Sequence, residues 1–217
     1  MGFLRILETI RTPFWDAVFQ FFTYFGEETF FMVMGMTIFW CISKRMGYFL
    51  LYISFLGNVI NQFLKLLFCI PRPWLIDDQF TIVESARGGA TGYSFPSGHT
   101  QGAAGLFLGI GRQVHNTAVR ICCVALVLIV AFSRMYLGVH TPADVLVSLG
   151  IATLLVMGSA PLFHRAWVHD WKWYLLLCGI MVGAAIGLVA YGEFATPPAN
   201  AIPEFTEHGI STAYKML

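Results

Sequence analysis

Long apolar runs divide this chain and leave it few ways to fold. Hydrophobic residues make up 57% of the 217 residues and charged residues only 12%, which excludes an ordinary water-soluble domain. Inside a bilayer, backbone polar groups must bond within the segment that carries them, and helices achieve this. We therefore predict an all-α membrane protein that forms a single domain over residues 1–217.

Six of the apolar runs are predicted to be transmembrane helices. An additional aromatic stretch, Pro13 to Phe25, is shorter than the about 20 residues needed to cross the hydrocarbon. We interpret it as a short interfacial helix with its rings at headgroup depth, and a short first span is the alternative. The six predicted spans cover about residues 27–43, 47–68, 97–111, 121–136, 142–162 and 173–191.

Polar and small side chains mark the faces of these spans that turn inward. The second span carries polar groups at helical spacing, which would be costly in lipid and should face the bundle interior: Asn58, Asn61, Gln62 and Lys65. Glycines at about one per turn in the third span predict close helix contact. Gly183 and Gly187 form a second small-residue pair in the sixth span.

A short stretch, Tyr93 to Thr100, joins a glycine-rich loop to the third span. The first amides of a helix have no intrahelical partner, and the helix dipole is positive there, so this junction is a ready anion site. His99 stands in the first turn and adds an acid–base group. Taken alone, the pattern is explained better by a capped helix with an unrelated histidine.

Two further motifs flank this stretch. In order, the residues are Lys65 to Pro73 (K-x6-R-P), Pro96 to His99 (P-S-G-H) and Ser133 to Asp144 (S-R-x5-H-x3-D). With these motifs the chain resembles the integral-membrane lipid phosphatase branch of the type 2 phosphatidic acid phosphatase superfamily.

The resemblance implies a phosphatase that uses a histidine nucleophile and needs neither a metal nor a cofactor. His140 would attack phosphorus, and His99 would protonate the leaving oxygen and then activate water. Asp144 would orient His140, as the carboxylate does in a Ser-His-Asp triad. Alternatively, Asp144 completes a capping box with Thr141, and both roles are compatible. The predicted phosphate-binding residues are Lys65, Arg72, Ser97, Gly98 and Arg134.

The resemblance also implies a lipid phosphate or diphosphate as substrate, of the undecaprenyl diphosphate, phosphatidylglycerophosphate or phosphatidic acid type. A phosphotransferase with an alcohol acceptor would use the same site, and a non-catalytic lipid transporter or binder is a third reading.

A net charge of +1 with scattered basic residues indicates no nucleic-acid partner. The five cysteines form no metal or disulfide pattern, and we expect buried free thiols. Glu84, Arg87 and Tyr93 precede the second motif and receive no role.

The predicted topology places all three motifs at one membrane face. Two spans separate the loop of the first two motifs from the turn of the third, so both reach the same side. The opposite face collects positive side chains, at Lys44, Arg45, Arg112, Arg120, Arg165 and Lys172. The positive-inside rule makes that face cytoplasmic, so we expect the site to face outward from a bacterial plasma membrane.

The end of the chain, Glu204 to Leu217, has the sequence of a starting helix. We expect the chain to be a truncated form of a longer protein, and a short amphipathic tail is the alternative.

Overall fold

The computed structural model describes residues 1–168, 171–198 and 200–215, and all regular structure in these ranges is helical. The α-helices are α1 (Gly2–Thr9), α2 (Pro13–Thr23), α3 (Glu28–Thr37), α4 (Lys44–Phe68), α5 (Pro73–Ile76), α6 (Gly98–Gln113), α7 (Thr117–Tyr136), α8 (Pro142–Val168), α9 (Lys172–Phe194) and α10 (Pro203–Tyr214). Short 3-10 turns cover Tyr24–Gly26 and Glu84–Ala86, and a π-helical turn, Ile38–Ile42, extends α3.

Within the described ranges, four helical segments are long and apolar enough to cross a membrane: Lys44–Ile76, Thr117–Tyr136, Pro142–Arg165 and Lys172–Phe194. A fifth span results if Pro13–Gly26 and Glu28–Ile42, bent by 53°, act together. The expectation of six spans and an interfacial N-terminal helix is not confirmed. The predicted third span, α6, has only 16 residues, and the aromatic stretch forms one arm of the bent pair.

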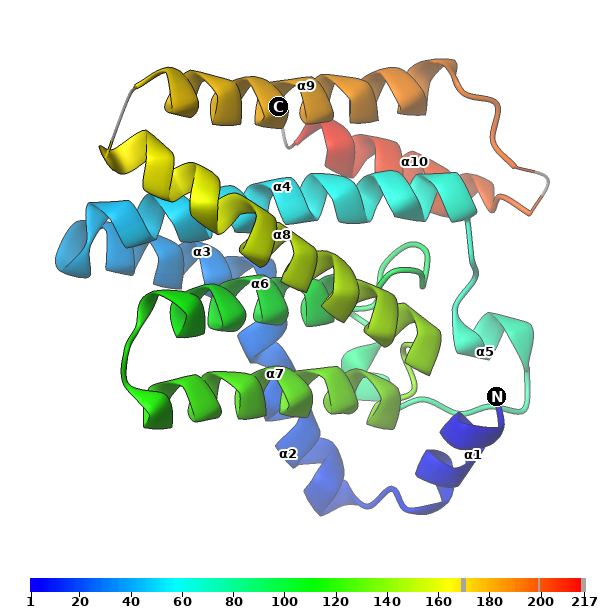
Figure 1. Cartoon of the computed structure of the whole chain (residues 1–217). Coiled ribbons are helices and arrows are strands. Elements are labelled where there is room, and N and C mark those ends of the chain that lie inside the picture. Colours follow the sequence, from blue (N-terminus) through cyan, green and yellow to red (C-terminus); the bar gives the residue numbers. More distant parts are fainter. Residues whose placement is uncertain (169–170, 199, 216–217) are drawn as a thin grey trace.

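Helix α6 packs against α4, α7 and α8 and lies inside the bundle (Figure 1). A Cβ atom on Gly109 would lie 2.6 Å from Cδ2 of Leu50 on α4, so a larger residue would require the Leu50 side chain to shift. The close contact predicted from the glycines of this helix is confirmed. On α9, by contrast, Cβ atoms on Gly183 and Gly187 would meet no described atom within 4 Å.

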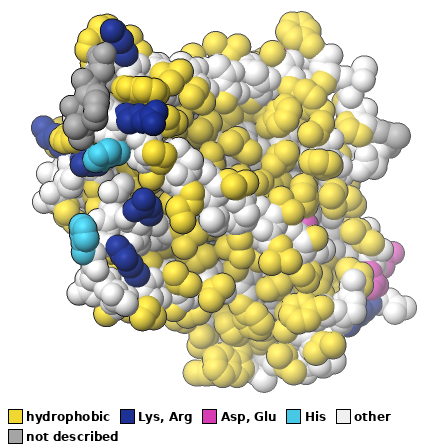
Figure 2. Space-filling view, in the orientation of Figure 1, with side chains coloured by type: hydrophobic (Ala, Val, Ile, Leu, Met, Phe, Trp, Pro, Cys, Tyr) yellow, Lys and Arg dark blue, Asp and Glu magenta, His cyan; other side chains and the backbone are white. Residues whose placement is uncertain are grey.

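The surface separates apolar and basic regions. Figure 2 shows a broad hydrophobic face with most of the visible Lys and Arg side chains gathered at one end. At that end lie the α3–α4, α6–α7 and α8–α9 junctions, which carry the basic residues predicted for the cytoplasmic face (Figure 1). Large exposed side chains such as Leu154, 75% exposed, suit contact with lipid. The prediction of buried thiols is wrong for Cys41, Cys122 and Cys178, because these apolar helix faces point outward from the bundle.

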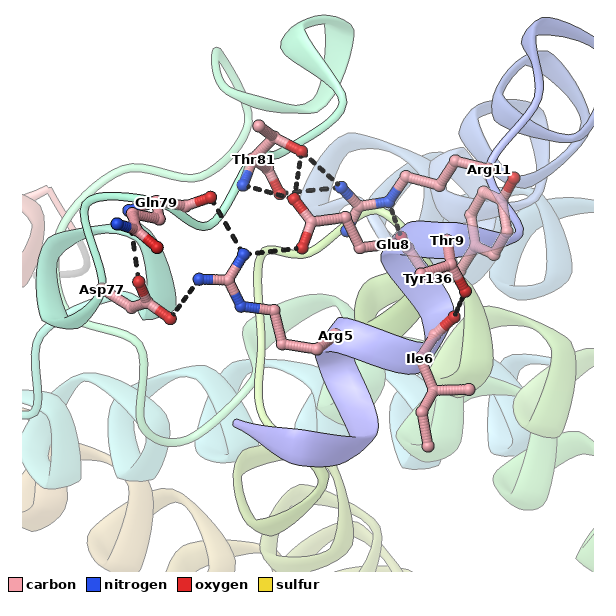
Figure 3. A network of polar contacts seen from close by, with 9 residues as sticks. All are labelled: Arg5, Ile6, Glu8, Thr9, Arg11, Asp77, Gln79, Thr81 and Tyr136. Atoms are coloured by element: carbon pink, nitrogen blue, oxygen red, sulfur yellow. Dashed lines mark hydrogen bonds and ion pairs between the residues drawn. The ribbon is translucent and has the colours of Figure 1, made fainter.

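The N-terminal segment holds the loop before the second motif against the end of α7 (Figure 3). Arg5 on α1 donates to Oδ2 of Asp77 at 2.6 Å. Arg11 donates to the carbonyl oxygens of Thr81 at 2.7 Å and Tyr136 at 2.9 Å. Because Tyr136 ends α7, this network fixes the start of the turn that carries the third motif.

The tail forms the helix that its sequence indicates. Helix α10 packs on α4 and α9, beside the C-terminal half of α4 (Figure 1). Met216 and Leu217, the last residues of the predicted tail, lie outside the described residues.

Candidate active site

A cavity of about 190 Å³ lies where the C-terminal half of α4, the start of α6 and α10 meet. Five of the predicted site residues line it: Lys65, Arg72, Gly98, His99 and His140. The other three are at most 2% exposed and lie behind this lining: Ser97, Arg134 and Asp144. The fold thus brings the three sequence motifs to one place.

Arg72 is the central donor of the cavity wall. It is 2% exposed, and it donates through Nε to the carbonyl of Gly92 at 3.0 Å and through Nη2 to that of Thr91 at 2.8 Å. Its Nη1 donates to the carbonyl of Val139 and to Nε2 of His140, both at 3.0 Å. These bonds anchor the guanidinium in both the loop before α6 and the turn after α7.

The bond from Arg72 decides the tautomer of His140. A guanidinium has no acceptor, so Nε2 must carry the lone pair and Nδ1 the proton. Nδ1 faces Oδ2 of Asp144 at 3.5 Å, which is too long for a hydrogen bond, and Nδ1 has no hydrogen-bond partner among the described residues. Burial and the positive charges of Arg72 and Arg134 lower the pKa of His140 well below its usual range, against the opposing carboxylate. The ring is therefore neutral at pH 7, as a nitrogen nucleophile must be.

Asp144 has the capping role weighed from the sequence, and its orienting role toward His140 stays a prediction. Its Oδ2 accepts from the backbone N–H of Thr141 at 2.8 Å, and its own N–H donates to the Thr141 hydroxyl at 3.3 Å, so the capping box is present. The same oxygen accepts from the hydroxyl of Ser94 at 2.6 Å and faces His140. These bonds hold the carboxylate in one orientation toward the ring.

Arg134 leaves donors unused. Its Nη1 donates to the hydroxyl of Thr23 on α2 at 2.7 Å, while Nε and Nη2 are buried and have no partner among the described residues. Buried unpaired donors are costly, and the cost is greater for a charged group. A planar guanidinium edge fits two phosphate oxygens, so an anion would satisfy this side chain. The carbonyl of Arg134 accepts the N–H of His140 at 3.3 Å, which places the two residues side by side.

Helix α6 begins where its sequence predicts. Gly98 is its first residue, and the hydroxyl of Ser97 caps the first turn. The N–H of Ser97 donates to the carbonyl of Asp144 at 3.3 Å and is therefore already paired. Gln101, one turn on, accepts from Asn61 at 2.9 Å and fastens α6 to α4.

Comparison with known proteins supplies the family. Residues 45–168, more than half of the chain, match the sequence model of the PAP2 superfamily. The chain belongs to the PAP2 superfamily. The resemblance inferred from the three motifs is thereby confirmed.

Curated relatives of this PAP2 chain are phosphatases by name. It is 28% identical over 166 residues to the probable sphingosine-1-phosphate phosphatase of Dictyostelium discoideum, covering 70% of this chain and 40% of that protein. It is 35% identical over 99 residues to the undecaprenyl-diphosphatase BcrC of Bacillus subtilis (strain 168), covering 46% of this chain and 48% of that one. The chain thus spans less than half the length of either relative.

A solved structure shares the fold. The first transmembrane PAP2-type phosphatidylglycerolphosphate phosphatase from Bacillus subtilis aligns with a TM-score of 0.59 and 25% identity, covering 72% of this chain and 82% of that one. Together with the apolar helices, this likeness identifies the present PAP2 superfamily member as an integral membrane protein.

Two partners of the PAP2 motifs were missed from the sequence. Ser94 stands two residues before the second motif, and its hydroxyl is the one sequence feature that could have indicated this contact. Thr23 bonds Arg134 from 111 positions away, and no local pattern marks it. Of the three loop residues without a role, Glu84 and Arg87 form an exposed ion pair outside the cavity, with 3.0 Å between Oε2 and Nε. The third, Tyr93, lines the cavity.

Metal ligands were not predicted for this PAP2 site. In the part of the chain that the structure describes, no three His, Cys, Asp or Glu side chains gather as metal ligands would. Independence from metals and cofactors stays a prediction for experiment.

Proposed function

We propose that this chain is a membrane phosphatase that hydrolyses a lipid phosphate or diphosphate through a phosphohistidine on His140. The observation that carries this proposal is the arrangement of His140, with Arg72 at 3.0 Å from Nε2 and the buried Asp144 facing Nδ1. This arrangement presents a neutral ring with its lone pair on Nε2, beside the buried guanidinium of Arg72.

The reaction has two steps. The Nε2 lone pair of His140 attacks phosphorus, an N–P bond forms, and the bond to the leaving oxygen breaks as His99 supplies a proton. Burial and the charge of Arg134 lower the pKa of His99, and the negative charge of a bound phosphate would raise it again. Asp144 stabilises the positive ring that results. His99 then takes a proton from water, whose oxygen attacks phosphorus and releases inorganic phosphate and the free ring.

The phosphoryl oxygens would be held by fixed positive groups. Arg72 would transfer its Nη1 donor from Nε2 to a phosphoryl oxygen, while its bonds to Gly92 and Thr91 keep it in place. Arg134 would use its free Nε and Nη2, and Lys65 would contribute its ammonium from the cavity wall. Ser97 caps the α6 turn whose amides, beginning at Gly98, would complete the cradle.

A lipid headgroup suits the position of this cavity. Asn58, Asn61, Gln62 and Lys65 line it along α4, a candidate membrane span, so a substrate can enter while its chains stay in the bilayer. The names of the relatives keep sphingosine phosphate and undecaprenyl diphosphate among the candidates. Phosphatidylglycerophosphate and phosphatidic acid also remain.

The test is a panel of phosphate esters with purified protein in detergent and lipid analogues below their micellar limit. We expect phosphate release with chelator present and a kcat/KM that rises with chain length, by at most about fourfold per methylene at ~0.8 kcal/mol each. Appearance of phosphate on an added alcohol instead would identify a phosphotransferase. Failure to release phosphate from any lipid, or an absolute need for a divalent metal, would overturn the proposal.

We further propose that the site faces outward. Basic residues gather at the end of the bundle away from the motifs, and such ends are cytoplasmic. In a variant without native cysteines, Asp78→Cys should react with an impermeant thiol reagent added to intact cells, whereas Arg165→Cys should react only after lysis. Both positions are exposed, so the pair is matched in accessibility to water. The reverse labelling pattern would place the chemistry in the cytoplasm.

A further inference from the structure

Helix α10 forms one wall of the cavity that holds the motif residues. Phe205, His208, Gly209 and Thr212 line this cavity together with His99 and His140. The family match ends at residue 168, so this wall comes from outside the matched region. The cavity-lining residues of α10 can therefore differ from one PAP2 protein to another and change which substrate the cavity binds.

Tyr93 fixes the start of α10. Its hydroxyl accepts from the N–H of Ile202 at 2.8 Å and lies 2.8 Å from the hydroxyl of Thr206, and its ring meets Phe205 edge-on at 5.6 Å. Tyr93 is 1% exposed and stands directly before Ser94, the partner of Asp144. Tyr93, to which the sequence analysis assigned no role, thus links α10 to the loop that holds Arg72 and Asp144 in place.

The other side of α10 is packed on α4 and α9. A Cβ atom on Gly209 would lie 2.7 Å from Cδ2 of Leu66, the residue after Lys65. Ala213 is 2% exposed in a cluster with Val59, Leu66 and Leu188. This packing leaves the cavity-facing residues of α10 at a fixed distance from the motif residues of α4.

His208 lies over the loop that holds Arg72. A Cβ atom on Gly92 would lie 3.5 Å from Cδ2 of His208, and the carbonyl of Gly92 accepts from Nε of Arg72 at 3.0 Å. Among the described residues, none hydrogen-bonds the His208 ring, which is exposed to the cavity. An imidazole always keeps at least one N–H, so it can donate to a phosphate oxygen.

Charge decides which part of a substrate belongs beside His208. The transferred phosphoryl group already has Lys65, Arg72 and Arg134. Of the remaining walls, the α3 side presents the carboxylate of Glu28, which repels a second anion, whereas α10 presents the free imidazole of His208. A second phosphate joined to the first is therefore best accommodated on the α10 side.

We propose that α10 is the wall that recognises the leaving group, and that His208 binds the inner phosphate of a lipid diphosphate. This inference rests on the proposed function above. His140 would take the terminal phosphoryl group, the bond to the bridging oxygen would break, and the lipid monophosphate held by His208 would depart. His208 would accordingly contribute to a diphosphate substrate and not to the matching monophosphate.

The experiment compares farnesyl diphosphate with farnesyl monophosphate, which share one chain. In His208→Ala, kcat/KM for the diphosphate should fall about tenfold, while that for the monophosphate should change less than twofold. His208→Gln keeps an N–H donor and should recover part of the loss. His115→Ala, an exposed histidine on the far side of the bundle, should change neither substrate.

Each outcome has a distinct meaning. Equal losses for both substrates, or no loss for either, in a His208→Ala protein of unchanged melting temperature would overturn the inference. If its melting temperature falls, the ratio of the two kcat/KM values within the His208→Ala protein still decides, because loss of folded protein lowers both values equally. If the unaltered protein releases phosphate from neither farnesyl compound, the diphosphate inference is overturned, and the proposed function fails only if no lipid of the panel releases phosphate either.

Discussion

His140→Ala is expected to lower kcat by roughly 10³-fold or more, because the substitution removes the atom that forms the bond to phosphorus. The fold should survive, since Arg72 keeps its bonds to the carbonyls of Gly92, Thr91 and Val139. Phosphate release from a lipid substrate, measured beside the melting temperature, checks this result.

His164→Ala is the matched control for His140→Ala. His164 is exposed, and it pairs with Arg45 at 2.9 Å at the opposite end of the bundle. Its loss should leave kcat within about twofold, in line with the small effect of most surface substitutions. Turnover of His140→Ala within about tenfold of the unaltered protein would rule out this residue as the nucleophile.

Asp144→Asn is expected to lower kcat by up to about 10⁴-fold, the loss seen when the carboxylate that orients a triad histidine is neutralised. An amide can still accept from Thr141 and Ser94, so the capping box remains. The missing charge no longer balances the positive ring in the phosphohistidine, although Arg72 still sets the tautomer of His140.

Ser94→Ala separates the charge of Asp144 from its position. This variant keeps the carboxylate and removes only the 2.6 Å bond to it, so we expect a loss of about tenfold. Steady-state kinetics with one short-chain lipid phosphate compares the two variants. Equal activity of Asp144→Asn and the unaltered protein would leave Asp144 with the capping role alone.

The residues of the candidate site could be predicted because each sits in a short local pattern. Lys65, Arg72, His99 and His140 are chemically distinctive, and their motifs follow one another in a fixed order. The helix starts were predictable for the same reason, since Ser97 and the pair Thr141 and Asp144 cap the turns that follow them. Such signals depend only on neighbours in the chain.

Long-range partners could not be predicted in this way. Nothing near Thr23 indicates that it accepts from Arg134, and Tyr93 gives no local sign that it anchors α10. These pairings depend on how helices approach one another, and many arrangements of the same helices would have satisfied the sequence pattern.

The membrane spans were the least accurate part of the prediction. Hydrophobicity marks an apolar run, but it does not distinguish a helix that meets lipid from one that is surrounded by protein. Helix α6 is the clearest case, because its 16 residues are too few for the hydrocarbon while its glycines allow burial among α4, α7 and α8. Cys122 shows the opposite error. It lies in an apolar run of the sequence, yet its side chain is exposed on the outside of the bundle.

The most direct test of the mechanism is the chemical position of the transferred phosphoryl group. In His99→Ala the second step loses its base, so a lipid diphosphate, whose leaving group needs little protonation, should load the enzyme faster than water clears it. Alkaline quenching, digestion and mass spectrometry would then locate the phosphoryl group. The account predicts phosphohistidine at His140. A phosphoryl group on any other residue, or continued phosphate release with no adduct, would contradict it.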